Sequence, residues 1–344
     1  MLLSGLVVGL AFGYALQRGR FCTNTAFRDV LLIRDDTLLR AWALAVAVQL
    51  LGVTALAGGG WLPVTVPPLW LGANLLGGVA FGIGMVLAGG CSSGTCYRVG
   101  EGLAGSLLAL IGFGVGIVVM AEGALAPLQE ALRRPLSTFD GEAPTLPGLL
   151  GVDPWLVVLP LLVIIAVWFW RSGRSSYRSG GWDWRAAGVA LGVVGVAAWL
   201  ASSAAGRPYG LSMTGPLRSW FEALFGGSLT LDWGSLLIVG LLAGSFLSAL
   251  VNGELRWRVP KGSRLLQSGA GGLFMGTGAQ LAGGCTIGHS LTGLSVLSLG
   301  SMVSTAAILL GAWATAYWLF VRPMRRMLRT TTAPGTPAAV GRGT

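Results

Sequence analysis

Long apolar runs recur along the whole chain, and they limit what it can fold into more than any other feature. A helix needs about 20 mostly apolar residues to cross a lipid bilayer. Nine runs approach that length, near residues 2–16, 38–58, 69–88, 102–121, 155–170, 186–205, 233–251, 265–283 and 298–321. Only 10% of the residues are charged, whereas soluble domains carry about 25%. We therefore expect an all-α polytopic membrane protein with about nine transmembrane helices, and not a soluble enzyme.

The basic residues predict an orientation for these spans. Of the 23 basic residues, 19 fall in one set of alternate loops, counting the span ends, and four fall in the other set. The four are Arg133, Arg134, Arg207 and Arg218. Since cytoplasmic loops carry the excess of Lys and Arg, we expect the N-terminus outside and the C-terminus in the cytoplasm of a cell inner membrane. Charges spread in this way form no single basic face, so no nucleic-acid partner is expected.

An internal repeat is the clearest pattern in the sequence. The segment 77–91 reads GGVAFGIGMVLAGGC and the segment 271–285 reads GGLFMGTGAQLAGGC, with nine of 15 positions identical at an offset of 194. Five spans separate the copies, so they enter the membrane in opposite directions, as in the inverted repeats of many transporters. We expect one transmembrane domain over 1–329 and a disordered cytoplasmic tail over 330–344. Within the domain we expect repeat one at about 1–124, a connecting span at about 153–172 and repeat two at about 186–321.

Paired glycines near the end of each repeat copy predict a break in the helix. Backbone that leaves a helix at membrane depth is tolerated only inside protein or beside a polar cavity. Such breaks aim backbone N–H groups and the positive ends of helix dipoles at an anion, so short re-entrant helices are expected. Because so few cations remain for the membrane interior, we expect the route to consist of backbone, glycine and thiols. The residues expected to support it are Gly89, Gly90, Ser92, Gly283, Gly284, Thr286 and His289.

Three of the four cysteines are candidate path residues. Cys91 and Cys285 occupy the same repeat position, and Cys22 lies in the polar segment GRFCTNTAFRD after the first run. Cys96 has no counterpart, since its repeat position holds Ser290. No CxxC pair is present, which argues against a resident metal site or a thiol-redox centre, and no cofactor is expected. Acids at the span ends, such as Glu101, are expected to be solvated.

These cysteine motifs resemble those of a known family. GRFC around Cys22, LAGGC ending at Cys91, and LAGGCTIGH with Cys285 and His289 resemble the YeeE/YedE family of sulphur-transport membrane proteins. The resemblance, from Gly19 to the last span, implies an inverted repeat of about nine helices, with motif cysteines lining a narrow central route for a sulphur-containing anion. Cys96 departs from the family pattern. No sulphur-carrier domain follows the last span, so we expect any such cytoplasmic partner to be a separate protein.

The resemblance and the repeat together predict a transporter rather than an enzyme. We expect uptake of thiosulfate or a related sulphur-containing anion past Cys22, Cys91 and Cys285. Two alternatives remain open, a membrane thiol-redox protein and a carrier of a soft metal or a selenium compound.

Overall fold

The computed structural model describes residues 1–134, 144–172, 181–224 and 231–324, and this part of the chain is all helical apart from isolated bridges and loops. Nine of its helices have 16 or more residues and coincide with the nine apolar runs. They are α1 (Leu3–Arg18), α3 (Thr37–Gly58), α4 (Leu71–Ala88), α6 (Ala104–Ala121), α9 (Pro154–Arg171), α10 (Trp184–Ala204), α12 (Trp233–Val251), α13 (Gly262–Ala282) and α14 (Leu299–Ala316). The predicted tail 330–344 lies outside the described residues.

Seven segments of the described chain form helices long and apolar enough to cross a membrane, so the protein is an all-α polytopic membrane protein. α1 and α13 are not among the seven. α1 has only 16 residues, which is short of the ~20 that span a bilayer. α13 contains polar residues along its length, including Arg264 and Gln280. Both helices nevertheless pack closely on other long helices, α1 on α12, and α13 on α4 and α6.

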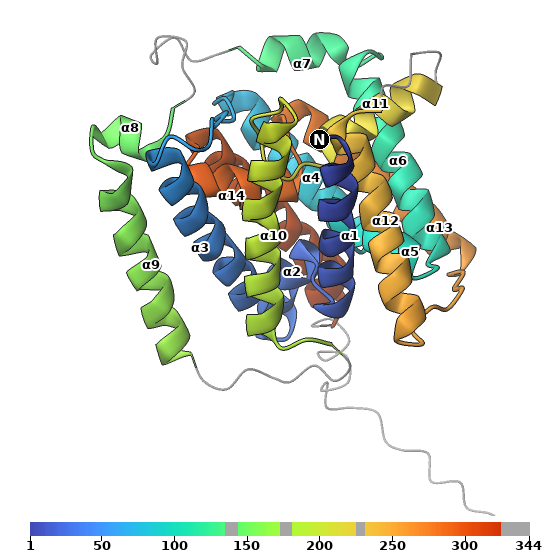
Figure 1. Cartoon of the computed structure of the whole chain (residues 1–344). Helices are drawn as coiled ribbons and strands as arrows, with labels where there is room; N and C mark the ends of the chain where they lie inside the picture. Colours follow the sequence, from blue (N-terminus) through green and yellow to red (C-terminus); the bar gives the residue numbers. More distant parts are fainter. Residues whose placement is uncertain (135–143, 173–180, 225–230, 325–344) are drawn as a thin grey trace, which may run out of the picture.

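Three short helices lie at one end of the bundle in Figure 1, together with the N-terminus: α7 (Ala126–Leu132), α8 (Leu146–Leu150) and α11 (Thr214–Leu224). The loops that follow α1 and α12 meet at the opposite end, where Arg20 forms an ion pair of 2.9 Å with Glu254. Alternate loops therefore gather at opposite ends of the molecule.

Glycines bring the central helices into backbone contact. A Cβ on Gly77 of α4 would stand 2.7 Å from the carbonyl oxygen of Gly278 on α13, and one on Gly84 would stand 2.6 Å from that of Gly271. α1 and α12 meet in the same way, because a Cβ on Gly9 would lie 3.0 Å from the Cα of its partner glycine. Small residues allow such close approach between helices in lipid.

The two paired-glycine segments end their helices, as predicted. α4 ends at Ala88 and α13 ends at Ala282, and the next residue, Gly89 or Gly283, has a left-handed φ of +74° or +85°. Glycine adopts this conformation without the steric penalty that a Cβ imposes. Short helices follow each break, α5 (Ser92–Gly100) after the first and a π-helical turn (Ile287–Gly293) after the second.

α9 is the most peripheral of the long helices. Val158 is its one buried residue, whereas Leu156, Ile164 and Trp170 are exposed. It contacts α3 and stands at the edge of the bundle in Figure 1. α9 corresponds to the span expected at about 153–172 as the connector between the two repeats, which stays a prediction.

Candidate functional site

Cys22 and Cys91 meet in the interior of the protein. Their Sγ atoms lie 3.7 Å apart, and the backbone N–H of Cys91 points at the sulphur of Cys22 at 3.5 Å. Both side chains are fully buried. Each residue is the N-cap of a short helix, Cys22 of α2 (Thr23–Leu32) and Cys91 of α5. Two helix N-termini, with their partial positive charge, therefore converge on the pair of thiols.

The turn after Cys91 is built around its sulphur. Sγ accepts a hydrogen bond from the backbone N–H of Gly94 at 3.4 Å and lies 3.5 Å from the hydroxyl of Ser93. Gly94 has no room for a side chain, because a Cβ would stand 2.5 Å from the sulphur of Cys22. The spacing Cys91-x-x-Gly94 thus allows the hydrogen bond that closes the turn, and the missing side chain of Gly94 leaves room for the thiol of Cys22.

Cys285 follows the second break and is also fully buried. Its backbone carbonyl accepts from the N–H of His289 at 2.9 Å. The imidazole Nδ1 of His289 lies 3.0 Å from the hydroxyl of Ser301, and a Cβ on Gly284 would lie 3.0 Å from Nε2. His289 therefore packs against the break that precedes it, as a buried polar residue of the second turn.

The structure does not bring all three predicted cysteines into one contact. Cys285 forms no sulphur hydrogen bond with another cysteine of the described chain. Cys96, which the repeat left unplaced, lies on α5 and is fully buried.

Buried polar atoms without a partner in the described structure flank both cysteine turns. Next to the Cys22–Cys91 pair in sequence are the hydroxyls of Thr23 and Ser92 and the amide of Asn24; next to Cys285 is the hydroxyl of Thr286. The Nε2 atom of His289 is a fifth such group. Buried polar groups are nearly always hydrogen-bonded, so a polar ligand at either turn would find free hydrogen-bonding groups there. Sequence reasoning selected Ser92, Thr286 and His289 but missed Thr23 and Asn24.

An arginine supports the carbonyl groups at each break, so a cation lies beside each of the two paired-glycine segments. Arg98 of α5 donates from Nη1 to the carbonyl of Gly89. Arg133 donates from Nε to the carbonyl of Leu281 at 3.2 Å, and its guanidinium carbon lies 4.6 Å from the ring centre of Trp70. Positive charge at the C-terminus of a helix is favourable. Burial, with the charge of Arg218, lowers the pKa of Arg133 to about 10, so Arg133 remains charged at neutral pH.

Glu101 is buried, not solvated as its position at a span end suggested. Its side chain is 6% exposed and accepts from Nε2 of Gln17 at 3.1 Å. The same nitrogen donates to Glu254, and the hydroxyl of Ser248 donates to the amide oxygen of Gln17 at 2.6 Å. This polar cluster joins α1, α5 and α12 at the end of the bundle opposite the N-terminus.

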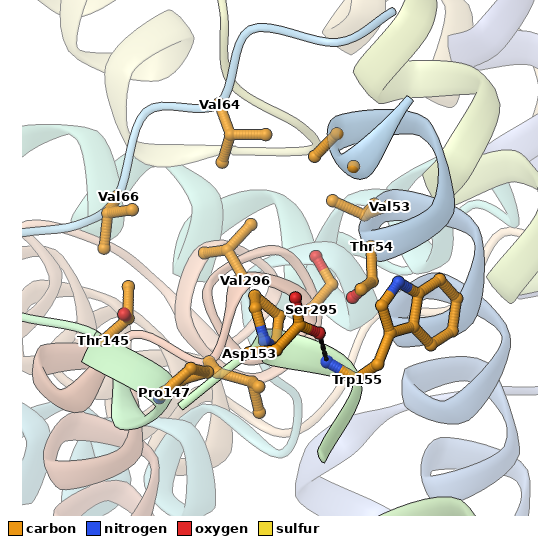
Figure 2. Close-up of a pocket in the computed structure, with 14 residues that line it drawn as sticks. Val53, Thr54, Val64, Val66, Thr145, Pro147, Asp153, Trp155, Ser295 and Val296 are labelled. Carbon is orange, nitrogen blue, oxygen red and sulfur yellow. Dashed lines mark hydrogen bonds between the residues drawn. The ribbon is translucent and has the colours of Figure 1, made fainter. Parts of the chain in front are cut away.

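A cavity of about 350 Å³ lies between α3 and the start of α9. Figure 2 shows Val53, Val64 and Val296 on its wall and the hydrogen bond from the N–H of Trp155 to Asp153, which measures 2.8 Å. Asp153 is the one charged residue among those that line it. An anion gains no favourable charge there, so this cavity does not extend the cysteine site.

The sequence also matches known proteins. Residues 18–314 match a protein family described as Sulphur transport. The chain is 40% identical over 335 residues to the thiosulfate transporter TsuA of Spirochaeta thermophila, which covers 94% of this chain and 100% of that protein. It is 34% identical over 353 residues to the thiosulfate transporter TsuA of Escherichia coli strain K12, with 97% and 99% covered. A shorter match, 35% over 98 residues and 28% of this chain, is to the probable transporter YedE of the same organism.

Proposed function

Because this chain belongs to the sulphur-transport family of membrane proteins, we propose that it carries thiosulfate or a closely related sulphur-containing anion through a path lined by cysteine thiols. The observation that carries the proposal is the approach of Cys22 and Cys91 to 3.7 Å between two helix N-termini. The near full-length similarity to two thiosulfate transporters supports the choice of substrate. The chain is a transport protein rather than an enzyme.

Thiols suit this ion chemically. Thiosulfate has a soft terminal sulphur and three hard oxygens, and a thiol offers it a weak S–H donor on a polarizable atom. Weak, repeated contacts favour conduction, because each site has to bind the ion and then release it. Protonated thiols avoid the repulsion that a thiolate would exert on a dianion. Cys285 provides a further thiol at the second break.

The oxygens of the ion need donors of their own. The unpartnered hydroxyls of Thr23 and Ser92, with the amide of Asn24, supply these beside the thiol pair. Thr286 and His289 supply them at the second break. Gly89, Gly90, Gly283 and Gly284 complete the path as the backbone of the two breaks.

We further propose that the two halves form an inverted repeat. Gly77 meets Gly278 and Gly84 meets Gly271, and an offset of 194 exchanges the members of these two contacts. α1 packs on α12 and α10 packs on α3, as expected if α1 and α10, and α3 and α12, are equivalent helices. Reciprocal contacts of this kind are what a two-fold axis in the membrane plane produces.

The distribution of cations supports an inner-membrane location with the N-terminus outside. Arg18 and Arg20 belong to the end at which the loops after α1 and α12 meet, and the cytoplasmic side carries the excess of such residues. A dianion that enters an inside-negative cell does so against roughly 4.6 kcal/mol per 100 mV. Consumption of the anion inside, for example through a separate cytoplasmic sulphur-carrier protein, would draw it inward.

Uptake of ³⁵S-thiosulfate by cells that depend on this protein tests the proposal. We expect wild type to support uptake and Cys91→Ala to abolish it at equal membrane abundance. Cys96→Ala is the matched control, since Cys96 is equally buried on the helix that Cys91 caps, and it should retain uptake. Normal uptake by an abundant Cys91→Ala protein would refute the thiol path.

The thiol-redox alternative draws on the same pair of sulphurs. It predicts that Cys22 and Cys91 cycle through a disulfide during activity, whereas transport requires both to stay reduced. Mass spectrometry of thiols trapped during uptake separates the two. The soft-metal alternative predicts stoichiometric copper or zinc in the purified protein, and an uptake panel that adds selenium analogues covers the selenium-compound carrier.

A further inference from the structure

A second cavity lies beside the helix break that precedes Cys91. It has a volume of about 320 Å³, and its wall includes Gly89 of the break together with Arg98 and Arg258. No Asp or Glu is among the described residues that line it. Ser106 and Ser268 add hydroxyl groups. In contrast to the cavity of Figure 2, its charged groups are all positive.

Arg98 stands between this cavity and the cysteine pair. Its guanidinium holds the Gly89 carbonyl, and a Cβ on Gly90 would lie 3.0 Å from Nη1. Gly90 directly precedes Cys91 in the chain, so the guanidinium lies beside the turn that holds the thiols. In the described chain Arg98 forms no ion pair with an acid. An anion that leaves the two thiols on this side therefore meets the guanidinium of Arg98 next.

The opposite wall is the N-terminus of α6. Leu103, Gly105 and Ser106 of its first turn line the cavity. The backbone of Arg258 is fixed against this turn. The N–H of Arg258 donates to the carbonyl of Gly102 at 3.0 Å, and the carbonyl of Arg258 accepts from the N–H of Ala104 at 3.1 Å. Arg258 likewise has no acidic partner in the described structure. An 18-residue helix adds partial positive charge at its N-terminus.

We propose that this cavity is a binding site for a small, doubly charged sulphur oxyanion, where the transported ion rests after it has passed Cys22 and Cys91. The inference rests on the proposed function and adds a defined site on the cytoplasmic side. A water molecule takes about 30 Å³ of the liquid, so the cavity holds such an ion with several waters. The ion leaves a nearly uncharged thiol site for one with two guanidinium groups, which favours forward movement against the membrane potential.

Sided membrane vesicles test this site. Inside-out vesicles expose the cytoplasmic face and right-side-out vesicles expose the outer face, so ³⁵S-thiosulfate uptake gives a KM for each face. We expect Arg258→Gln to raise the KM at the cytoplasmic face about threefold to tenfold and to leave the KM at the outer face near the wild-type value. Arg258→Lys should restore most of the lost affinity, since it keeps the charge.

Arg256→Gln is the matched control. It removes the same charge from the same exposed segment, but Arg256 does not line the cavity. Both KM values should stay at the wild-type level. Arg98→Gln should raise the cytoplasmic KM as well, with a lower maximal rate at both faces because the Gly89 carbonyl loses its support.

The outcomes separate the two proposals. Equal cytoplasmic KM values for Arg258→Gln, Arg256→Gln and wild type overturn the cavity site while thiosulfate transport stands. An effect of Arg258→Gln confined to the outer face also overturns it, because the cavity then faces outward. Absence of thiosulfate movement by wild type in both vesicle types refutes the transport function itself.

Discussion

The thiol sulphurs of Cys22 and Cys91 lie 3.7 Å apart inside the protein, although 69 positions of sequence separate the two residues. A disulfide has an S–S length of about 2.05 Å, so a small approach suffices to join them. Dilute hydrogen peroxide should therefore oxidise the pair to a disulfide, with the peroxide reduced to water, and block thiosulfate uptake until dithiothreitol is added. Peptide mapping should find the Cys22–Cys91 link. Cys96→Ser should remain equally sensitive to peroxide, and a link that involves Cys96 instead would contradict this geometry.

Gly94→Ala should reduce uptake by about tenfold or more, because the new Cβ would stand 2.5 Å from Sγ of Cys22 and 3.3 Å from Sγ of Cys91. Helix propensity favours alanine by about 1 kcal/mol, so a loss cannot come from the helix itself. Gly215→Ala is the control, since a Cβ at that helical position meets no atom within 4 Å. Uptake and protein abundance are measured together. The crowding argument fails if the two variants transport equally well.

Replacement of Gly89 should depend on backbone preference alone. Its φ is +74° and a Cβ there would meet nothing within 4 Å. Gly89→Ala should therefore lower the free energy of unfolding by about 1 kcal/mol, and Gly89→Asn by less, because asparagine tolerates the left-handed region. Gly283→Asn should be worse than Gly89→Asn, since a Cβ would stand 3.0 Å from the Trp70 ring. Thermal unfolding in detergent gives the ranking, and an alanine variant as stable as wild type would contradict it.

The folding stability of the protein should decrease in acid because of the protonation of Glu254. Burial alone would raise the pKa of Glu254, but the hydrogen bond from Gln17 and the charges of Arg20 and Arg18 outweigh it, so the pKa lies below the usual range. The carboxylate then contributes stability above the unfolded pKa of about 4.3, and this contribution is lost as the pH falls through the lower folded pKa.

Glu254→Gln should accordingly cost about 1 kcal/mol at pH 7 and match wild type in strong acid. Unfolding curves measured across pH check this. Glu130→Gln on the exposed part of α7 serves as the reference for loss of a carboxylate without an ion pair in the described structure. A Glu254→Gln deficit that persists unchanged below the folded pKa would show that packing, not charge, is responsible.

The helices of this protein were largely predictable, because a helix that crosses a bilayer needs about 20 mostly apolar residues in a row. The run expected at 233–251 is α12 to the residue, and the run at 155–170 is α9 within one residue at each end. The breaks were predictable for a related reason. A pair of glycines indicates a position where the backbone adopts a left-handed φ. This signal lies within a few neighbouring residues, so it can be read from the sequence.

Contacts between distant segments were not predictable in this way. Nothing near Cys22 or Cys91 in sequence indicates that their sulphurs meet, since α2 and α5 are brought together by the packing of longer helices. Glu101 was expected in water because it follows a span, whereas Gln17 from α1 covers it. Arg98 is one of the 19 basic residues that were counted in one set of alternate loops, whereas the structure places it against the break it follows.

The glycine contact between α4 and α13 bears on how an ion is let through. Rocking of one half of the protein against the other would separate backbones that touch at Gly77 and Gly278 and again at Gly84 and Gly271. Interfaces packed this closely tolerate only small sliding. Under the proposed inverted repeat, the two halves would therefore move as one frame, and passage of the ion would depend on groups small enough to move within it. The rotation of the Arg98 guanidinium and the opening of the turn from Cys91 to Gly94 are movements of that size, so the proposed path would be gated by side chains within a fixed frame.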